Sequence, residues 1–183
     1  MKITFNSPVV LGYAFISAIV YFALLNFNIG TSIFVLRPEF DVTSFTWYIS
    51  LFGYGLGHGS ADHLIGNMTF ILLLGPVLEE KYGSKNLLIM ILSCVLITAI
   101  LHIAFFSHGL LGASGVVFMF IILVSLTNYK SGEIPLTFIL IVLLFVGKEI
   151  WQFFDNDGIS HFAHIMGGAV GAVFGMQFGK AKE

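Results

Sequence analysis

The sequence predicts an all-α polytopic membrane protein. Of its 183 residues, 57% are hydrophobic and only 10% are Asp, Glu, Lys or Arg, and the mean hydropathy is +0.97. Soluble domains carry roughly 25% charged residues, so these values exclude a soluble protein. The few charges lie in short clusters between apolar runs, which is typical of a bundle of membrane-spanning helices. Eight basic and ten acidic residues give a net charge of −2, so we expect no nucleic-acid partner.

Polar breaks divide the chain into six candidate spans, because each span needs about 20 apolar residues. The first apolar run is long and has no convincing small-residue cleavage site after it, so we interpret it as an uncleaved span. The stretch 29–61 is expected to form a long outer loop, and its aromatic side chains Trp47 and Tyr48 suit the membrane interface. In one domain over 1–183, the spans are predicted at about 8–28, 62–78, 86–106, 111–128, 134–154 and 159–178.

The basic residues predict the orientation. Arg37 falls on the loop side and Lys148 falls within a span. The other six basic residues share the side that holds both termini: Lys2, Lys81, Lys85, Lys130, Lys180 and Lys182. The positive-inside rule therefore places both termini in the cytoplasm and the loop 29–61 outside.

Polar residues inside a bilayer are costly, and four of them are predicted at similar depth on the outer side. Ser114 lies near the start of the fourth span and His164 near the start of the sixth. A histidine can take the serine proton near neutral pH, so the two residues are predicted to form a catalytic dyad. His63 and Asn67 are spaced i, i+4 on one helix face, and with the backbone N–H of Ser114 they can stabilise an oxyanion. The structural alternatives are a helix-packing serine and an interhelical polar contact.

The remaining histidines are given other roles. His58 lies five residues before His63, off its helical face, and is expected to hold the outer segment by hydrogen bonding. His102 and His108 flank the outer end of the third span, where we interpret them as interfacial residues. His161 is expected near the mouth of the site, with no assigned role.

Lys148 and Glu149 lie late in the fifth span, near the predicted level of Ser114. A desolvated lysine can serve as the base for a serine, which leaves a Ser-Lys dyad as an alternative. We favour pairing of the two residues with other polar groups, or extension of the charged ends toward the interface. The single cysteine, Cys94, excludes an intramolecular disulfide, and the sequence predicts no metal site and no cofactor.

Three separated motifs resemble those of the rhomboid intramembrane serine proteases. The motifs are His58-x4-His63-x3-Asn67, Gly112-Ala113-Ser114-Gly115 and Ala163-His164-x2-Gly167, and the similarity runs from about residue 45 to 178. The resemblance implies the six-transmembrane-helix rhomboid fold of the minimal bacterial type. It also implies that Ser114 is the nucleophile and His164 the general base, that His63 and Asn67 assist the oxyanion, and that His58, Gly112, Gly115 and Gly167 are structural residues near the site.

The sequence departs from the family pattern at two places. Where bacterial relatives often carry a Trp-Arg pair, this chain reads Tyr48-Ile49-Ser50, so an arginine anchor of the outer loop is absent. One helical turn after Ser114, a tyrosine common in the family is replaced by Phe118. The Phe118 ring can still stack beneath His164, but it cannot donate a hydrogen bond.

The expected function is therefore that of an intramembrane serine endopeptidase, in the bacterial inner membrane, that cleaves single-span membrane proteins near the outer face. The partners are transmembrane protein substrates and membrane lipid, and no oligomeric state is predicted. One alternative is an inactive rhomboid-like protein that binds clients without cleavage. Another is a small transporter with a proton relay through His63, His164 and Glu149, although no internal repeat supports it.

A stripe of glycines is predicted to hold the sixth span against the fourth. Gly167, Gly171, Gly175 and Gly179 recur every four residues, and His164 precedes Gly167 by three. Small residues on one helix face allow close approach of a neighbouring helix. The stripe should therefore bring His164 within hydrogen-bond reach of Ser114.

Overall fold

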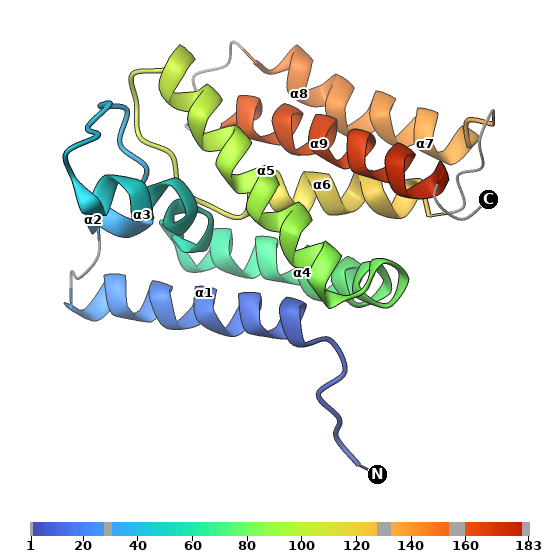
Figure 1. Cartoon of the computed structure of the whole chain (residues 1–183), viewed down its shortest axis with the longest axis horizontal. Helices are drawn as coiled ribbons and strands as arrows, with labels where there is room; N and C mark the ends of the chain where they lie inside the picture. The colour runs from blue at the N-terminus through green and yellow to red at the C-terminus, as the bar shows by residue number, and fades with distance from the viewer. Residues whose placement is uncertain (1, 28–30, 128–132, 154–159, 181–183) are drawn as a thin grey trace.

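A computed structural model describes residues 2–27, 31–127, 133–153 and 160–180, and in these ranges the regular secondary structure is helical apart from one isolated β-bridge (Figure 1). The helices, in chain order, are α1 (Pro8–Phe27), α2 (Thr31–Phe34), α3 (Phe45–Gly53), the 3₁₀ turn η1 (Tyr54–Leu56), α4 (Ala61–Tyr82), α5 (Ser84–Phe105), α6 (Ser114–Ser125), α7 (Leu136–Ile141), the π-helical turn η2 (Val142–Val146), α8 (Gly147–Trp151) and α9 (His161–Lys180).

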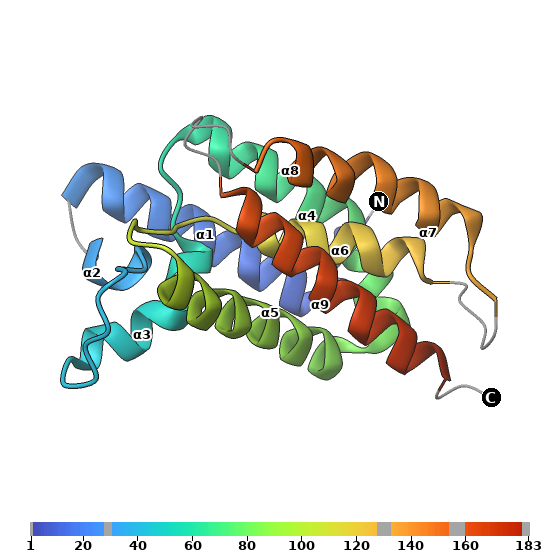
Figure 2. The ribbon, with the colours of Figure 1, turned by 90° about the horizontal axis from the view of Figure 1, so that it is seen from above.

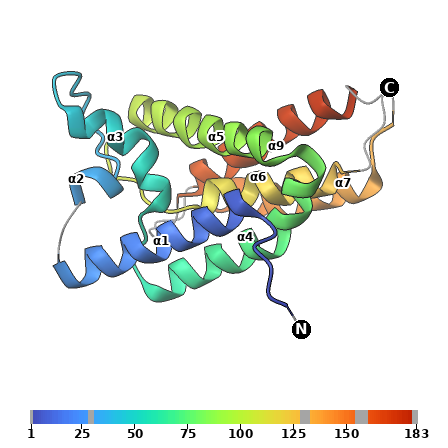
Figure 3. The same cartoon turned by 60° about the horizontal axis from the view of Figure 1, so that its bottom comes forward.

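Helix α6 lies at the centre of the bundle and packs against α4, α5, α7 and, most extensively, α9 (Figure 2). The outer helix α1 packs mainly against α4. Helices α2 and α3 gather at one end of the bundle, whereas the last turn of α9 lies at the opposite end (Figures 1 and 3). The buried core follows the central helix, where Met119, Phe120 and Leu123 have no exposed surface.

Three helices within the described residues are long and apolar enough to cross a membrane, namely α1, α4 and α5, with mean hydropathies of 2.1, 1.4 and 2.7. Their outward faces carry large apolar side chains, such as Phe15, Ile19 and Phe22 on α1, each at least 60% exposed. An apolar surface of this extent suits lipid and not water. The chain therefore has an all-α polytopic membrane fold.

Two polar contacts join helix ends within the bundle. The buried carboxylate of Glu79, near the end of α4, accepts hydrogen bonds from the backbone N–H groups of Val9 and Val10 at 3.0 Å each. These two donors belong to the first turn of α1, which has no helical acceptors for them and favours negative charge. Lys81 donates to the backbone carbonyls of Leu126 and Thr127, at the end of α6. The ends of α1, α4 and α6 that are predicted to face the cytoplasm are thus connected by hydrogen bonds from two charged side chains.

The observed helices differ from the predicted spans at several limits. Helix α4 continues to Tyr82 beyond the predicted limit of 78, because its charged last turn is partnered by α1 and α6. Helix α6 begins at Ser114 and not at 111. The fifth predicted span is one helical run from 136 to 151 that contains a π-helical turn.

The predicted outer loop 29–61 also contains structure that its composition did not indicate. Helices α2 and α3 and the turn η1 lie within it, and α4 already begins at Ala61. Ser60 begins α4 by accepting from the backbone N–H of His63 at 3.1 Å, an ordinary N-cap. The predicted limits 28, 29, 128, 154 and 159 and the residues Lys130 and Lys182 lie outside the described residues.

Candidate active site

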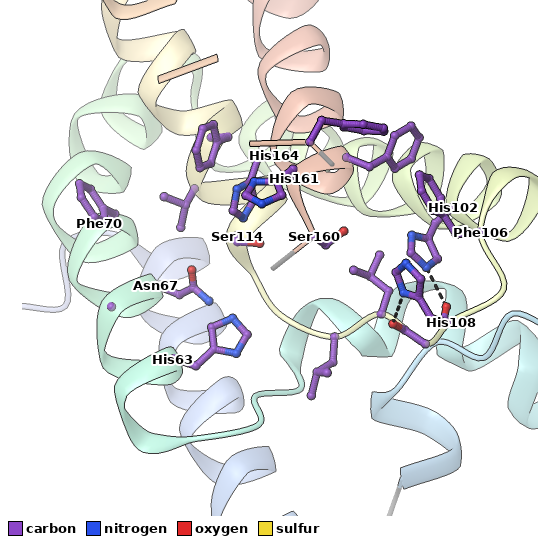
Figure 4. Close-up of a pocket in the computed structure, with 18 of the residues that line it drawn as sticks. His63, Asn67, Phe70, His102, Phe106, His108, Ser114, Ser160, His161 and His164 are labelled. Carbon is purple, nitrogen blue, oxygen red and sulfur yellow. Dashed lines mark hydrogen bonds between the residues drawn. The ribbon is translucent and has the colours of Figure 1, made fainter. Parts of the chain in front are cut away.

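A cavity of about 870 Å³ opens between α4, α6 and α9, and four predicted site residues line it. His63 and Asn67 come from α4, Ser114 from α6 and His164 from α9. Figure 4 shows these side chains around one space, with Ser114 next to His164 in the view and His63 and Asn67 on the opposite wall. The fold thus brings residues separated by up to about 100 positions to a single cavity.

The start of α6 is set by backbone contacts outside the helix. Leu110 forms a two-bonded antiparallel bridge with Leu36, with N–H···O distances of 2.9 and 3.0 Å. Gly112 follows with a φ of +124° and donates its N–H to Tyr54 O at 2.9 Å. This φ is strained for any residue with a Cβ, so glycine allows the chain to turn from the bridge into the helix. Ser114 is therefore the first residue of α6, not the fourth as the sequence suggested.

The depth of Ser114 follows from the length of α6. Twelve residues span about 18 Å at 1.5 Å per residue, and the hydrocarbon layer is about 30 Å thick. The far end of α6 is marked by the charged contact with Lys81. Helix α6 is therefore too short to cross the layer, so its two ends, Ser114 and Ser125, cannot both lie at a membrane face.

Helices α6 and α9 touch through backbone next to the two predicted dyad residues. A Cβ at Gly167 would overlap the carbonyl group of Gly115, and a Cβ at Gly115 would lie 3.1 Å from Ala163 O. The glycine stripe predicted from the sequence therefore faces α6 at Gly167, and also at Gly171, where a Cβ would lie 2.7 Å from Met119 O. The surroundings of Gly179 lie outside the described residues.

This contact brings the chain positions of Ser114, which precedes Gly115, and His164, which follows Ala163, close together, and both side chains line the cavity. Among the hydrogen bonds of the described residues, none joins Ser114 Oγ to His164. Catalytic hydrogen bonds are often long in a free enzyme and shorten only when substrate is bound.

The His164 ring is held on two sides. It stacks on Phe118 with ring centroids 4.3 Å apart and an interplanar angle of 8°. Its Nδ1 lies 2.7 Å from Oε2 of Glu149, a buried residue of α8. The remaining ring nitrogen, Nε2, is the atom available to Ser114.

His63 and Asn67 surround the turn at Gly112. A Cβ on Gly112 would lie 2.7 Å from Cε1 and 2.8 Å from Nε2 of His63, so the imidazole rests against the backbone two residues before Ser114. Asn67 Nδ2 lies 3.1 Å from Nε2 of the buried His58. His58 Nδ1 in turn lies 3.1 Å from the carbonyl oxygen of Leu56 and donates to it.

His58 is the neutral anchor of this wall. Burial lowers the pKa of its imidazole to about 4, against a smaller raising effect of the Leu56 carbonyl and a further lowering effect of nearby His63. The ring is therefore uncharged at neutral pH, with Nδ1 as donor and Nε2 as acceptor. One N–H of the Asn67 amide donates to His58, and its other N–H can donate to a group in the cavity.

The structure corrects one role assigned to the outer histidines. His102 is fully buried and is not an interfacial residue, and its Nε2 lies 2.9 Å from His108 O (Figure 4). His108 itself is exposed. Both residues line the cavity at the end away from His63.

No role was predicted for His161, and the structure places it beside the predicted base. Its Nδ1 lies 2.6 Å from the same Glu149 oxygen that contacts His164. The sequence did contain one relevant signal, the i, i+3 spacing of His161 and His164, which puts both on one helix face. Glu149, however, belongs to another helix, so its part in the cluster could not be read from spacing.

Comparison with known proteins identifies the family of the chain. The family model of the Rhomboid domain matches residues 45–181. The chain is also similar to Rhomboid-related protein 1 of Caenorhabditis elegans, with 32% identity over 156 residues. That match covers 78% of this chain and 42% of the nematode protein, so the chain spans about two fifths of that relative's length. The protein is thus an all-α membrane bundle with a polar cavity between its helices, and the chain belongs to the rhomboid family.

Proposed function

We propose that the protein is an intramembrane serine endopeptidase in which Ser114 is the nucleophile and His164 the general base. The observation that carries the proposal is that both residues line one cavity inside the membrane fold, with α6 and α9 in backbone contact beside them. A serine hydroxyl needs an adjacent base, and His164 Nε2 is available for that role.

The reaction follows ordinary acyl transfer. Ser114 Oγ attacks the scissile carbonyl carbon while its proton passes to His164 Nε2, and a tetrahedral oxyanion forms. His164 then gives this proton to the leaving amine nitrogen as the C–N bond breaks, which leaves an acyl group on Ser114. Water attacks the acyl carbon, its proton passes to His164, and Ser114 recovers its proton when the product acid departs.

Three donors support the oxyanion step. Ser114 is the first residue of α6, so its backbone N–H has no helical acceptor and lies at the positive end of the helix. The second N–H of the Asn67 amide and the imidazole of His63 face the same cavity. Donors fixed in place before the charge develops are the usual means of lowering this barrier.

An apolar groove offers a route by which a substrate helix could reach the cavity. The groove measures about 460 Å³ and lies between α4, α6 and α7, with Leu74, Ile121 and Ile141 in its wall. Phe70 lines both the groove and the cavity. This continuity supports membrane-spanning segments as the class of substrate, approached from the lipid between α4 and α7.

The proposed location is the bacterial inner membrane, with both termini in the cytoplasm and cleavage near the outer face. The lysine distribution supports this orientation. In a background in which Cys94 is replaced by alanine, a membrane-impermeant thiol reagent should label Asp41→Cys in sealed cells. Lys2→Cys should react only after permeabilisation, and the reverse pattern would refute the orientation.

A fluorophosphonate probe tests the catalytic proposal without a known substrate. The wild-type protein should be labelled covalently at Ser114, and both Ser114→Ala and His164→Ala should lose labelling. Because residues that act as one unit are not additive, the double variant should resemble either single variant. A folded wild-type protein that reacts no faster than Ser114→Ala would favour an inactive rhomboid-like protein that binds clients.

A further inference from the structure

The predicted base, His164, contacts a buried carboxylate that the proposed Ser-His dyad does not use. Glu149 is 6% exposed, and its Oε2 lies 2.7 Å from Nδ1 of His164 and 2.6 Å from Nδ1 of His161. Of the residues that the structure describes, Glu149 is not among those that line the cavity. The carboxylate therefore lies behind the imidazole, on the side opposite to the one that serves Ser114.

The backbone before Glu149 aims this side chain at α9. A π-helical turn, η2, runs directly into α8, and such turns insert one extra residue into a helix. One extra residue rotates everything after it by about 100°. Glu149 is buried in this register, whereas its neighbours Lys148 and Ile150 are exposed. Departures of this kind inside helices are frequent at functional sites.

The distances identify the kind of interaction. Separations of 2.6 and 2.7 Å are those of charge-assisted hydrogen bonds. A cation bound to a nitrogen and an oxygen at about 2.0 to 2.2 Å from each would hold the two atoms more than 3 Å apart at a tetrahedral angle. The three side chains, whose ligand atoms all lie within 4.8 Å, are therefore arranged as a hydrogen-bonded cluster.

Hydrogen-bond chemistry then fixes the state of the base. An ionised carboxylate only accepts, so Nδ1 of His164 must carry a proton. Neutral imidazole has one N–H, which leaves Nε2 without a proton and able to take one from Ser114 Oγ. When that proton arrives, the imidazolium lies next to a negative charge in a site of low dielectric.

We propose that Glu149 is a positioning residue that holds His164 in the Nε2-acceptor tautomer and stabilises the imidazolium formed during the reaction, so that the dyad operates with a third, acidic member. The inference rests on the proposed protease function of Ser114 and His164. His161 shares the same oxygen, and its ring, 6.3 Å from that of His164, fixes the carboxylate from the other side.

The test compares Glu149→Gln, Glu149→Asp and Lys148→Gln in the full chain. Cleavage of a single-span substrate gives kcat and KM, and the rate of fluorophosphonate labelling reports Ser114 reactivity alone. Lys148→Gln is the matched control, because it changes the charge of the adjacent, exposed residue. Proton NMR of histidine-labelled protein gives a readout without activity, since a strongly hydrogen-bonded Nδ1–H resonates far downfield and is assigned by its loss in His164→Ala.

We expect Glu149→Gln to lower kcat and the labelling rate by at least about 10²-fold with little change in KM, since loss of a triad acid costs roughly 10⁴-fold in well-studied serine proteases. Glu149→Asp should recover part of the rate, Lys148→Gln should keep it, and the downfield His164 signal should vanish in Glu149→Gln. If Glu149 had only a structural role, the activity of each variant would fall only in proportion to its folded fraction.

Two results would overturn the inference and leave the protease intact. One is a wild-type kcat and labelling rate in Glu149→Gln, and the other is the lack of a downfield His164 resonance in the active wild-type protein, which decides the question even if Glu149→Gln does not fold. A wild-type protein that neither cleaves nor reacts with the probe would instead overturn the proposed function, and with it the role of Glu149.

Discussion

At the scale of single residues, the cavity wall depends on a glycine that no other residue can replace. Gly112 combines a φ of +124° with the closest approach to the His63 ring, so a side chain there is opposed both by strain and by contact. Glycine is thus required at position 112 for two reasons, the backbone conformation and the nearby His63 ring.

Gly112→Ala should therefore lower fluorophosphonate labelling of Ser114 by about tenfold or more and destabilise the protein by about 1–3 kcal/mol, the usual cost of such backbone strain. Gly12→Ala is the control, because a Cβ at Gly12 meets no atom within 4 Å and alanine favours a helix. Wild-type reactivity and stability in Gly112→Ala would show that the turn has another conformation.

Protonation of His58 in the unfolded chain makes the stability of the protein depend on pH. The native pKa is about 4 and the ordinary value is 6.5, so the unfolded chain binds a proton between these pH values that the native state does not. The free energy of unfolding should consequently fall as pH drops from about 6.5 toward 4, with a slope of at most about 1.4 kcal/mol per pH unit from this group.

The measurement is the difference in thermal midpoint between wild type and His58→Gln, in detergent, from pH 7.5 to 4. Glutamine offers an acceptor to Asn67 without titrating, so the advantage of the wild-type protein should shrink below pH 6.5. Parallel curves for the two proteins over the whole range would contradict a neutral buried His58.

At the scale of helices, the contact between α6 and α9 sets the spacing of the predicted dyad. Gly167, Gly171 and Gly175 all lie against α6, where Met119 and Leu126 fill the space that a Cβ would need. Period and residue type were enough to predict this stripe, because small residues every four positions have one common use in a membrane. Phe174, three residues after Gly171, packs against the core.

Gly171→Leu should force α6 and α9 apart and lower cleavage at least as much as thermal stability, although position 171 lies about two turns from His164. A hydrogen bond between Ser114 and His164 needs a separation of about 3 Å, and the helix displacement that a leucine side chain requires would exceed it. Val173→Leu is the matched control, because Val173 is 51% exposed on the same helix. Unchanged activity and midpoint in Gly171→Leu would mean that the two helices do not approach here.

Other helix limits depended on contacts that lie far away in sequence. Helix α6 begins at Ser114 because Leu110 pairs with Leu36, and α4 extends to Tyr82 because Glu79 caps α1. The π-helical turn before α8 has no signature in an apolar run. Hydropathy locates helices in a membrane protein well, but their ends are decided by tertiary hydrogen bonds that no local pattern contains.

At the scale of the whole molecule, the membrane class and the family could be predicted from the sequence, since both rest on composition and on three spaced motifs. The gathering of His63, Asn67, Ser114 and His164 at one cavity fits their predicted common depth. Pairing of Glu149 with other polar groups was predicted from the sequence and is observed. Its shared contact with His161 and His164 and the burial of His102 could not be predicted, because a polar residue in an apolar run indicates an energetic cost and does not identify the partner.

The catalytic function of Ser114 is tested most directly by reconstituting the protein in liposomes with a panel of single-span membrane substrates. We expect wild type to produce discrete fragments cut near the outer face, and Ser114→Ala, folded with a wild-type thermal midpoint, to produce none. Equal cleavage by both proteins, or none of any substrate by the folded wild type, would contradict an intramembrane protease built on Ser114.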